Sequence, residues 1–405
     1  MSNWDVCRID DLGTVNRGKS KHRPRNDSIL FGGSYPFIQT ADVKKANLYI
    51  TEYDTTYSDI GLAQSKLWDK GTLCITIAAN IAESAILGID ACFPDSVVGF
   101  IPHKGKADLK FVKYLLDEFK VYMQQISKGT TQDNLSLDKL RRVKFNVPDY
   151  ETQVKIANTL STYDDLIENN NKRIKLLEQM AENLYKEWFV RFRFPGYENA
   201  AFENGIPAGW EYVQLGDILS FERGISYSSE EIDCDEGLNL INLKNIDAFG
   251  GFRRDGTKKY NGKYKESQAV KTGDLVIGVT DMTQDRRTVG AAALIPTIEG
   301  LSVISADLVK VVSDVPNIYL YSLCRYGFYS KYFSQFANGA NVLHLKPGAL
   351  LNKKLLLPTK ELIDAFVEKA SATIELIDGL NIANDNLMRQ RNLLLPRLMS
   401  GKLEV

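Results

Sequence analysis

The feature that most constrains this chain is an uninterrupted helical stretch between residues 149 and 194. It contains neither glycine nor proline, and Pro148 and Pro195 bound it on either side. Apolar residues recur along it every seven positions, and a second series follows three positions after the first. This is the pattern of a long helix that packs against a partner helix; at about 1.5 Å per residue it would span roughly 70 Å. The two series are Leu160, Ile167, Ile174, Ala181 and Trp188, and Tyr163, Asn170, Leu177 and Leu184.

The sequence also contains a long internal repeat. One set of anchor residues near the N-terminus recurs 206 positions later, and another set around the first helix recurs 210 positions later. The difference between the offsets places insertions inside the globular segments, where loops tolerate them. The first set pairs Trp4, Asp11, Arg17 and Gly18 with Trp210, Asp217, Arg223 and Gly224; the second pairs Gly129, Leu135, Leu140, Pro148 and Glu151 with Gly339, Leu345, Leu350, Pro358 and Glu361.

The repeat predicts that globular domains and long helices alternate along the chain. We expect a first domain at residues 1–148, a helix at 149–194, a second domain at 195–358 and a second helix at 359–405. Short β-rich apolar runs mix with helical patterns inside each globular segment, which indicates an α/β organisation.

Each predicted helix has an apolar stripe that needs a partner, and the other helix is the nearest matching surface. Their pairing gives an antiparallel coiled coil, and the end of the chain then returns to its beginning. The alternative is that each helix packs only on its own globular domain, but the persistence of the heptad favours the pair. The expected fold class is therefore α+β, with two α/β domains separated by two long helices, pseudo-twofold and circular in topology.

Both helices are weakest at the same register. Gly379 interrupts the second helix, where an interior glycine costs on the order of 1 kcal/mol relative to alanine. The equivalent part of the first helix is the run of asparagines at residues 169–171. Asn170 and Asn384 lie on the seam, where a buried polar residue can specify register. The equally favoured alternative is that both turn partly to solvent.

Composition excludes several classes of protein. With 405 residues and 44 % hydrophobic content, the chain can form two or three domains with substantial cores. Fifty Lys and Arg balance 51 Asp and Glu, so the net charge does not indicate what kind of molecule the chain binds. The five cysteines are scattered without CxxC spacing, which indicates neither a disulfide framework nor a zinc site. Because no signal peptide or membrane-spanning run is apparent, we expect a soluble cytoplasmic protein without membrane contact.

Local clusters of positive charge favour a polyanionic partner, since cations that contact phosphates release counterions. The alternative for any single basic run is a solvated loop. A second and a third cluster, with tyrosines interleaved in the second, support the functional interpretation. The candidate phosphate-binding residues are Arg17, Lys19, Lys21, Arg23 and Arg25 in the first cluster, Arg253, Arg254, Lys258 and Lys259 in the second, and Arg286 and Arg287 in the third.

A polar turn at residues 129–135 precedes an apolar segment and carries side chains that can read base edges. Glutamine and asparagine can pair bidentately with adenine, and threonine can contact a base or a phosphate. Ordinary turn chemistry is the bland alternative, and residue type alone favours it. The candidate base-reading residues are Thr130, Thr131, Gln132 and Asn134.

The sequence contains few residues in arrangements typical of catalysis. Asp95, Asp108 and Lys110 resemble a degenerate metal-nuclease pattern, but Asp108 opens a predicted helix and the second half has no equivalent. The three histidines are isolated, so they provide no metal cluster and no Ser/His/Asp arrangement. Phosphate-binding glycine loops are also missing from the sequence. These observations indicate a binding protein without its own active site.

The ordered and duplicated motifs resemble the specificity subunit of bacterial type I restriction–modification enzymes along the whole chain. The second copy departs from the first at residues 339–345, which lack the Thr-Gln pair, so contacts inferred for the first loop do not transfer to it. The motifs that carry the resemblance are residues 129–135 continuing through Val147, Pro148, Gln153, Ile156, Leu160 and Ile167; Glu187, Trp188 and Phe189 with Phe194 and Pro195; residues 205–210; and residues 392–401.

The resemblance implies two target-recognition domains, each reading one part of a split, asymmetric double-stranded DNA sequence. The paired helices would set the unread spacer, and two methyltransferase (modification) subunits would bind the helical regions 149–194 and 359–405. Restriction subunits would dock on that core. S-adenosylmethionine, ATP and Mg²⁺ would belong to these partners, so that this chain itself holds no cofactor, metal or catalytic residue.

Two alternatives remain open from the sequence. The first is a stand-alone metal-dependent nuclease that uses Asp95, Asp108 and Lys110. The second is a coiled-coil scaffold with two protein-binding modules and no DNA partner.

Overall fold

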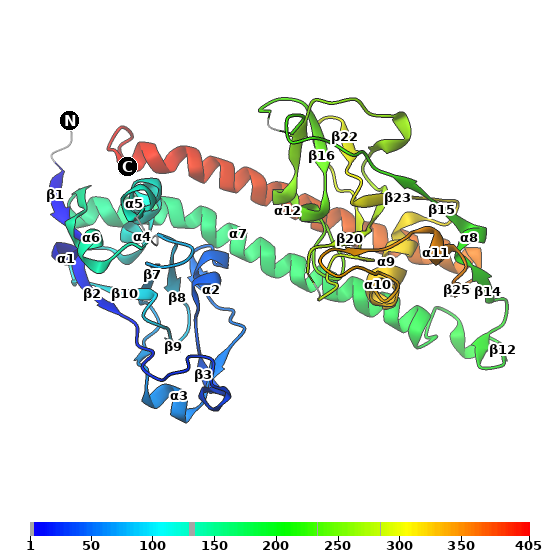
Figure 1. Cartoon of the computed structure of the whole chain (residues 1–405), viewed down its shortest axis with the longest axis horizontal. Helices are drawn as coiled ribbons and strands as arrows, with labels where there is room; N and C mark the ends of the chain where they lie inside the picture. Colours follow the sequence, from blue (N-terminus) through cyan, green and yellow to red (C-terminus); the bar gives the residue numbers. More distant parts are fainter. Residues whose placement is uncertain (1–3, 129–133, 233, 284) are drawn as a thin grey trace. The chain divides into compact units, whose positions relative to one another are not determined.

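The computed structural model describes residues 4–128, 134–232, 234–283 and 285–405 (Figure 1). The chain divides into two compact units. Unit 1 comprises Met1–Asn171 together with Ile382–Val405, and unit 2 comprises Lys172–Asn381. Each unit therefore contains one α/β portion and one segment from each of the two long helices.

Unit 1 is built on a five-stranded sheet with the strand order β2-β10-β7-β8-β4. Its strands are β2 (Gly13–Arg17), β10 (Val97–Pro102), β7 (Leu73–Thr76), β8 (Ser84–Leu87) and β4 (Tyr49–Ile50). Three two-stranded sheets accompany it: β1 (Asp5–Arg8) with β11 (Lys144–Val147), β3 (Phe31–Pro36) with β5 (Thr56–Tyr57), and β6 (Leu67–Trp68) with β9 (Ala91–Cys92). The helices of this portion are α1 (Ile9–Leu12), α2 (Thr40–Lys45), α3 (Asp59–Ala63), α4 (Leu109–Glu118), α5 (Lys120–Ser127) and α6 (Leu137–Arg142).

Unit 2 contains two four-stranded sheets, ordered β15-β23-β19-β21 and β17-β16-β22-β18. The first consists of β15 (Leu219–Arg223), β23 (Leu308–Ser313), β19 (Leu275–Gly278) and β21 (Ala292–Leu294); the second of β17 (Lys258–Tyr260), β16 (Leu238–Ile241), β22 (Ser302–Ile304) and β18 (Ala269–Val270). Short pairs join β14 (Glu211–Gln214) to β25 (Lys354–Leu357), β20 (Thr280–Asp281) to β24 (Leu343–His344), and β12 (Phe202–Glu203) to β13 (Ile206–Pro207). Its helices are α8 (Leu215–Ile218), α9 (Asn317–Tyr326), α10 (Tyr329–Ser334) and α11 (Gly348–Leu351).

The long helices are α7 (Tyr150–Tyr185), which continues through a π-helical turn (Lys186–Val190), and α12 (Lys360–Met399). Asp149 caps α7 by accepting a hydrogen bond from the Thr152 backbone N–H at 2.9 Å. Within each unit, the two helix segments lie side by side and run antiparallel (Figure 1). The prediction of two long helices that pair as an antiparallel coiled coil in an α+β protein is confirmed.

Both helices contribute to the core of each unit. In unit 1, Leu160 of α7 and Leu398 of α12 are fully buried in one apolar cluster with the sheet. In unit 2, the buried ring of Phe366 from α12 lies edge-on to Trp188 and Phe189. Trp4 and Leu403 pack against the same cluster of unit 1, so the two ends of the chain belong to one unit, as the circular topology requires.

The sequence repeat is also a structural repeat. β1 pairs with β11 through Asp5 and Val147, and β14 pairs with β25 through Glu211 and Leu357. In both units the next strand ends in an arginine and is followed by a glycine that lies against backbone. A Cβ on Gly18 would be 2.3 Å from the Pro94 carbonyl oxygen, and a Cβ on Gly224 would be 2.1 Å from that of Ser305. Only glycine allows this close approach.

Asparagines occupy the seam in unit 1. The Asn170 amide donates to Oδ1 of Asn384 at 2.9 Å, and the Asn384 amide donates to Oδ1 of Asn171 at 2.9 Å. Asn384 is only 6 % exposed. The structure therefore shows the first of the two alternatives, in which these asparagines pair across the seam and do not turn to solvent. A shift of one helix along the other would separate the paired amides and leave buried polar groups without partners.

A buried polar network ties α12 to the α/β portion of unit 1. The Asp164 side chain on α7 is 1 % exposed and forms an ion pair with Arg391 on α12. It also accepts hydrogen bonds from Asn47 at 2.9 Å and from the Tyr114 hydroxyl. The Arg391 guanidinium donates in turn to Oδ1 of Asn47 at 2.9 Å. Four segments far apart in sequence thus meet at one carboxylate.

Among the described residues, no helix has the length and apolar character needed to cross a membrane.

Replacing Asp164 by alanine should lower the free energy of unfolding by about 3 kcal/mol, because it leaves the Arg391 guanidinium without its buried partner. Urea denaturation of wild type and variant measures the change. Asp165→Ala is the matched control, since the Asp165 side chain is 56 % exposed and its ion pair with Lys110 is 3.9 Å long. If Asp164→Ala unfolded at the same urea concentration as wild type, the structural role of the network would be contradicted.

Replacing Gly379 by alanine should raise the free energy of unfolding by about 1 kcal/mol, because alanine is the better helix former. Gly379 lies inside α12, and a Cβ added there would meet no atom within 4 Å. Thermal unfolding measures the effect, and Gly18→Ala, which has no room for a Cβ, should be destabilising in the same assay. A lower melting temperature for Gly379→Ala would show that this glycine has a role beyond flexibility.

Candidate nucleic-acid interface

The first basic cluster is an exposed segment whose backbone is fixed from several sides. Arg17 ends strand β2, and the Gly18 N–H donates to the Val97 carbonyl at 2.9 Å. Gln64 Oε1 accepts from the backbone N–H of Lys21 at 2.6 Å and from that of His22 at 3.0 Å. The segment is therefore held in one path across the surface of unit 1, and its side chains point into solvent from a defined backbone.

The five cations of this cluster differ in what they already bind. Arg25 forms an ion pair with Asp95 at 2.9 Å, and Arg23 donates to nearby backbone carbonyls. Arg17, Lys19 and Lys21 are exposed and make no ion pair with any described residue. Three of the five predicted phosphate-binding side chains are thus available for a polyanion, and the charge of Arg25 is partly neutralised.

An acidic residue follows directly after this cluster. The Asp27 carboxylate accepts hydrogen bonds from the Ile29 backbone N–H and from His22, and these hold its pKa below the usual range. It stays ionised at neutral pH, so it limits the basic surface on that side.

The polar turn lies mostly outside the described residues, because Thr130, Thr131 and Gln132 fall in the gap at 129–133. Asn134 is exposed, and its N–H donates to the Ser127 carbonyl at 3.1 Å. The next residue, Leu135, is buried, and its N–H donates to the Ile77 carbonyl at 2.9 Å. Asn134 is therefore placed beside the end of strand β7.

The equivalent turn of unit 2 is attached in the same way. The N–H of Leu345 donates to the carbonyl of Val279 at 2.8 Å, directly after strand β19. Leu135 and Leu345 are partners in the sequence repeat, and so are the ends of β7 and β19. Both units thus bring the turn before α6 or α11 next to the end of a central strand.

The second basic cluster is largely occupied by contacts within unit 2. Arg253 pairs with Asp255 at 3.0 Å, and the Lys259 amine donates to Oδ1 of Asn239 at 3.1 Å. Arg254 forms an ion pair with Asp378 on α12. Lys258 is half-buried on β17 and makes no ion pair with any described residue. Of these four cations, Arg254 has a clear structural role, since it attaches the α/β portion to the helix.

The third cluster lies on the loop after β20. Arg287 pairs with Asp285 at 2.8 Å, while Arg286 donates to the Ser334 carbonyl at 3.1 Å. The Phe249 N–H donates to the Arg287 carbonyl at 2.7 Å, so the loop after the 3₁₀ turn Leu243–Asn245 lies against this one. This contact brings two loops of unit 2 together that sequence reasoning did not connect.

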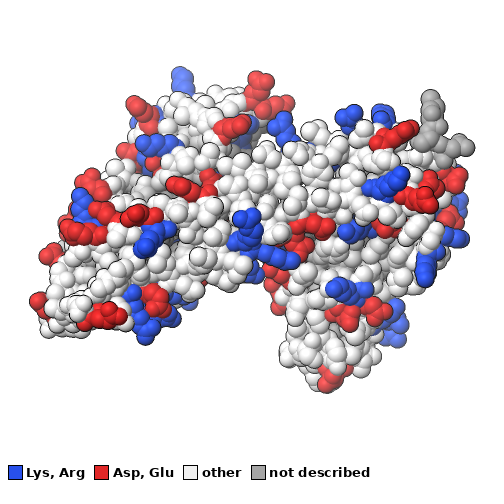
Figure 2. Space-filling view, turned by 180° about the vertical axis from the view of Figure 1, so that it is seen from behind, with Lys and Arg blue, Asp and Glu red and all other residues white. Residues whose placement is uncertain are grey.

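Bulk charge gives no guide to the interface. On the face shown in Figure 2, Lys and Arg side chains are interspersed with Asp and Glu across the surface. This agrees with the near-neutral composition, and any contact with phosphates must come from local groups such as Lys19 and Lys21.

The residues of the nuclease alternative have other roles. Asp95 binds Arg25, and Asp108 caps helix α4 by accepting from the Phe111 N–H at 2.9 Å. Lys110 donates to the Ser161 hydroxyl at 3.0 Å. Across the described ranges, no group of three or more His, Cys, Asp or Glu residues is placed to hold a metal ion. The proposed trio is therefore not a metal site, because each member is held by a different structural partner.

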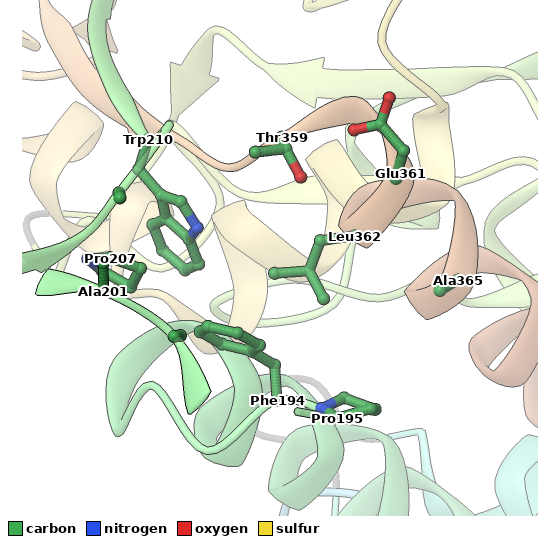
Figure 3. Close-up of a pocket in the computed structure, with 11 residues that line it drawn as sticks. Phe194, Pro195, Ala201, Pro207, Trp210, Thr359, Glu361, Leu362 and Ala365 are labelled. Carbon is green, nitrogen blue, oxygen red and sulfur yellow. The ribbon is translucent and has the colours of Figure 1, made fainter. Parts of the chain in front are cut away.

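A hollow of about 410 Å³ lies in unit 2, between the connector that follows α7 and the start of α12 (Figure 3). Phe194, Trp210 and Leu362 face one another across it, and Glu361 is the one charged residue among those that line it. Such an apolar lining provides packing surface and lacks the converging polar groups that catalysis needs.

Comparison with known proteins shows which proteins this chain is similar to. A family model described as type I restriction modification DNA specificity domain matches residues 1–179. The MjaIX specificity subunit of Methanocaldococcus jannaschii, a type I restriction enzyme subunit, is 27 % identical and aligns over 99 % of this chain and 94 % of its own length. The chain is thus similar over its whole length to type I restriction enzyme specificity subunits, and residues 1–179 match the model of their DNA specificity domain.

Other relatives also align over the full length of the chain. The HindI specificity subunit of Haemophilus influenzae is 22 % identical, and the alignment covers 100 % of both chains. The crystal structure of the type I restriction–modification S subunit from M. genitalium has the same fold, with a TM-score of 0.59 at 15 % identity, over 98 % of this chain and 96 % of that one. The family resemblance seen in the sequence motifs is thereby confirmed.

Replacing Lys19 or Lys21 by alanine should weaken binding to every DNA sequence alike and reduce the slope of log K against log salt by about 1 for each charge removed. Titration of the assembled subunit complex with duplex DNA at several salt concentrations measures the slope. Arg25→Ala serves as the matched control and should change the slope less, because Asp95 already neutralises Arg25. Unchanged slopes for the lysine variants would remove this segment from the interface.

Proposed function

We propose that this chain is the DNA-recognition subunit of a type I restriction–modification complex and reads a split, asymmetric target with its two units. The duplicated frame is the observation that carries this proposal. Equivalent strands, glycines and turns recur in units 1 and 2, which gives two similar modules, each suited to one stretch of duplex. The full-length similarity to type I specificity subunits supports the same conclusion.

Differences between the modules support an asymmetric target. The segment 129–135 contains the Thr-Gln pair, whereas its counterpart in the sequence repeat, 339–345, contains Ala340, Asn341 and His344. Because direct readout depends on the donors, acceptors and methyl groups that each loop presents, two loops of different chemistry select different bases.

The long helices suit the role of a spacer between the two reads. α7 and α12 each contribute segments to both units, and the Asn170–Asn384 pair opposes slippage of one helix along the other. In this proposal the length of the helices sets the number of base pairs left unread.

Exposed apolar residues on the helices offer seats for partner subunits. Each unit presents such residues from both helices, although a helix in water normally exposes polar groups on its outer face. We assign these positions to two methyltransferase subunits, one per unit, with restriction subunits docking on the resulting core. The residues are Leu166, Met388 and Leu393 in unit 1, and Leu176, Met180 and Leu376 in unit 2.

In this proposal the chain is not itself an enzyme. S-adenosylmethionine, ATP and Mg²⁺ would be bound by the methyltransferase and restriction subunits, and this chain would select the DNA sequence on which they act. A pure protein scaffold, the remaining alternative, gives no reason for a fixed exposed segment that carries three cations without acidic partners.

Co-expression of this chain with its methyltransferase subunits, followed by genome-wide mapping of methylated bases, tests the function. We expect methylation at a bipartite sequence whose halves differ and whose spacer has one length. Deleting the chain, as the control, should abolish site-specific methylation. Methylation at a single contiguous sequence, or methylation that does not depend on this chain, would contradict the proposal.

A further inference from the structure

The central hairpin of unit 1 ends in an unusual tip. Strands β7 and β8 pair antiparallel, and residues 77–83 connect them. Three residues of this connection have left-handed backbone without being glycine: Ala79 (φ 48°), Asn80 (φ 25°) and Ala82 (φ 62°). Left-handed alanine is energetically unfavourable, since its Cβ crowds the backbone. Such conformations persist where the surroundings impose them, and they concentrate at functional sites.

The surroundings do impose this shape. The Thr76 hydroxyl bonds to the Asn80 carbonyl and accepts from the Glu83 N–H at 2.9 Å. The Gln124 amide donates to the Ile81 carbonyl at 3.0 Å. Lys120 pairs with Glu83 at 2.7 Å. Helix α5 therefore holds the tip from one side, while the Thr76 side chain closes it from within.

The rigid tip presents one polar side chain, that of Asn80. Asn80 is exposed, and its Oδ1 has a single long contact, with the Lys44 amine at 3.4 Å. The tip adjoins the base of the polar turn, because the Leu135 N–H donates to the Ile77 carbonyl at 2.9 Å. The hairpin that carries Asn80 is thus attached at its base to the turn that contains Asn134, and the Lys44 amine adds a positive charge at Asn80.

Unit 2 has a loop at the corresponding place. It connects β19 to β21. The Asp281 carboxylate links the two ends of this loop, because it accepts hydrogen bonds from the backbone N–H groups of Thr283 at 2.8 Å and Thr288 at 2.7 Å. Burial alone would raise the pKa of Asp281, but these hydrogen bonds hold it below the usual range. Asp281 is consequently ionised at neutral pH, and its charge-assisted bonds give the loop a firm base.

This loop also presents one side chain prominently. Met282 is 77 % exposed, more than any other large hydrophobic residue among those described. Arg286, on the same loop, has a left-handed backbone (φ 54°), and the ion-paired Arg287 follows it. Met282 therefore offers an exposed apolar side chain on a loop that also carries two arginines, a combination that suits base edges bordered by phosphates in a groove.

The two tips are structural equivalents. The Ile77 N–H donates to the Ser96 carbonyl at 2.9 Å, and the Val279 N–H donates to the Asp307 carbonyl at 2.8 Å. Their own carbonyls accept from Leu135 and Leu345, the leucines that end the two repeat turns. The same backbone frame therefore carries an amide side chain in one unit and a thioether in the other.

We infer that these two hairpin tips read bases in the two halves of the target, with Asn80 as a specificity-determining residue of unit 1 and Met282 of unit 2. The inference rests on the proposed function and deepens it. Asn80 has the donor and acceptor that adenine matches at its N7 and N6 edge, and Met282 presents an apolar surface that fits the thymine methyl group. The different chemistry of the two tips contributes to the asymmetry of the target.

The bland explanation for Asn80 is that asparagine tolerates left-handed backbone better than other residues. That explanation accounts for the backbone conformation but gives the amide side chain no role. Variants can therefore distinguish a backbone role from a side-chain role. Asn80→Gly keeps the backbone preference and removes the amide. Ala79→Gly relaxes the neighbouring strain and leaves every side chain in place beyond one methyl group.

The experiment maps methylated sites in cells that co-express the methyltransferase subunits with wild type or with Asn80→Gly, Ala79→Gly, Met282→Ala or Met282→Leu. We expect Asn80→Gly to reduce discrimination at one base position of one half-site by about tenfold or more. Met282→Ala should do so in the other half only. Ala79→Gly should retain the wild-type target sequence, and Met282→Leu, which keeps a large apolar side chain, should lose less discrimination than Met282→Ala.

Asn80→Asp gives a second, independent readout, because aspartate accepts from the cytosine amine and cannot donate to adenine. We expect it to change the preferred base at the position that Asn80→Gly relaxes, a result that a purely structural role would not produce. Wild-type discrimination in both Asn80→Gly and Met282→Ala, or equal loss in both halves for either variant, would overturn the inference while the proposed function stands. If the wild-type complex itself methylates no bipartite site, the proposed function fails first.

Discussion

Helix segments from both halves of the chain complete each unit, and the rest of the structure depends on this packing. Leu398 of α12 is buried in the core of unit 1, and Trp188 in the π-helical turn after α7 is buried in that of unit 2. Large apolar side chains at these places stabilise each unit by removing surface from water, on the order of 2 kcal/mol for each fully buried residue. The α/β portions cannot separate from the helices without exposing these side chains to water, so each unit holds its loops in a fixed position relative to its helix segments.

Polar contacts then decide how the helices meet. The Asn170–Asn384 pair and the Asp164–Arg391 network contribute little net energy compared with apolar packing, but a shifted register would bury their groups without partners. Unit 2 uses Arg254 and Asp378 in the same way. Buried polar groups thus act against alternative arrangements, which matters for a protein whose proposed task is to hold two reading surfaces in a defined relation.

The proposed recognition residues lie on loops whose attachment to the sheet is the same in both units and whose side chains differ. Hydrogen bonds from Leu135 and Leu345 attach equivalent turns to equivalent strand ends, and the tips beyond them carry Asn80 and Met282. A fixed backbone with variable side chains lets base preference change without loss of the fold. The cations proposed to contact the DNA backbone are a separate group, so in this proposal affinity and specificity depend on different residues.

The sequence by itself determined the duplicated plan, the two long helices, their pairing and the family resemblance, because heptad spacing, repeat offsets and motifs are properties of residue order. Only the tertiary structure decided which charges are free. Arg25 meets Asp95 and Arg254 meets Asp378 across 70 and 124 positions, and such pairings depend on long-range geometry that local patterns do not encode. The same holds for Asn80, whose left-handed backbone arises from contacts with Thr76 and α5 and leaves no periodic signal in the sequence.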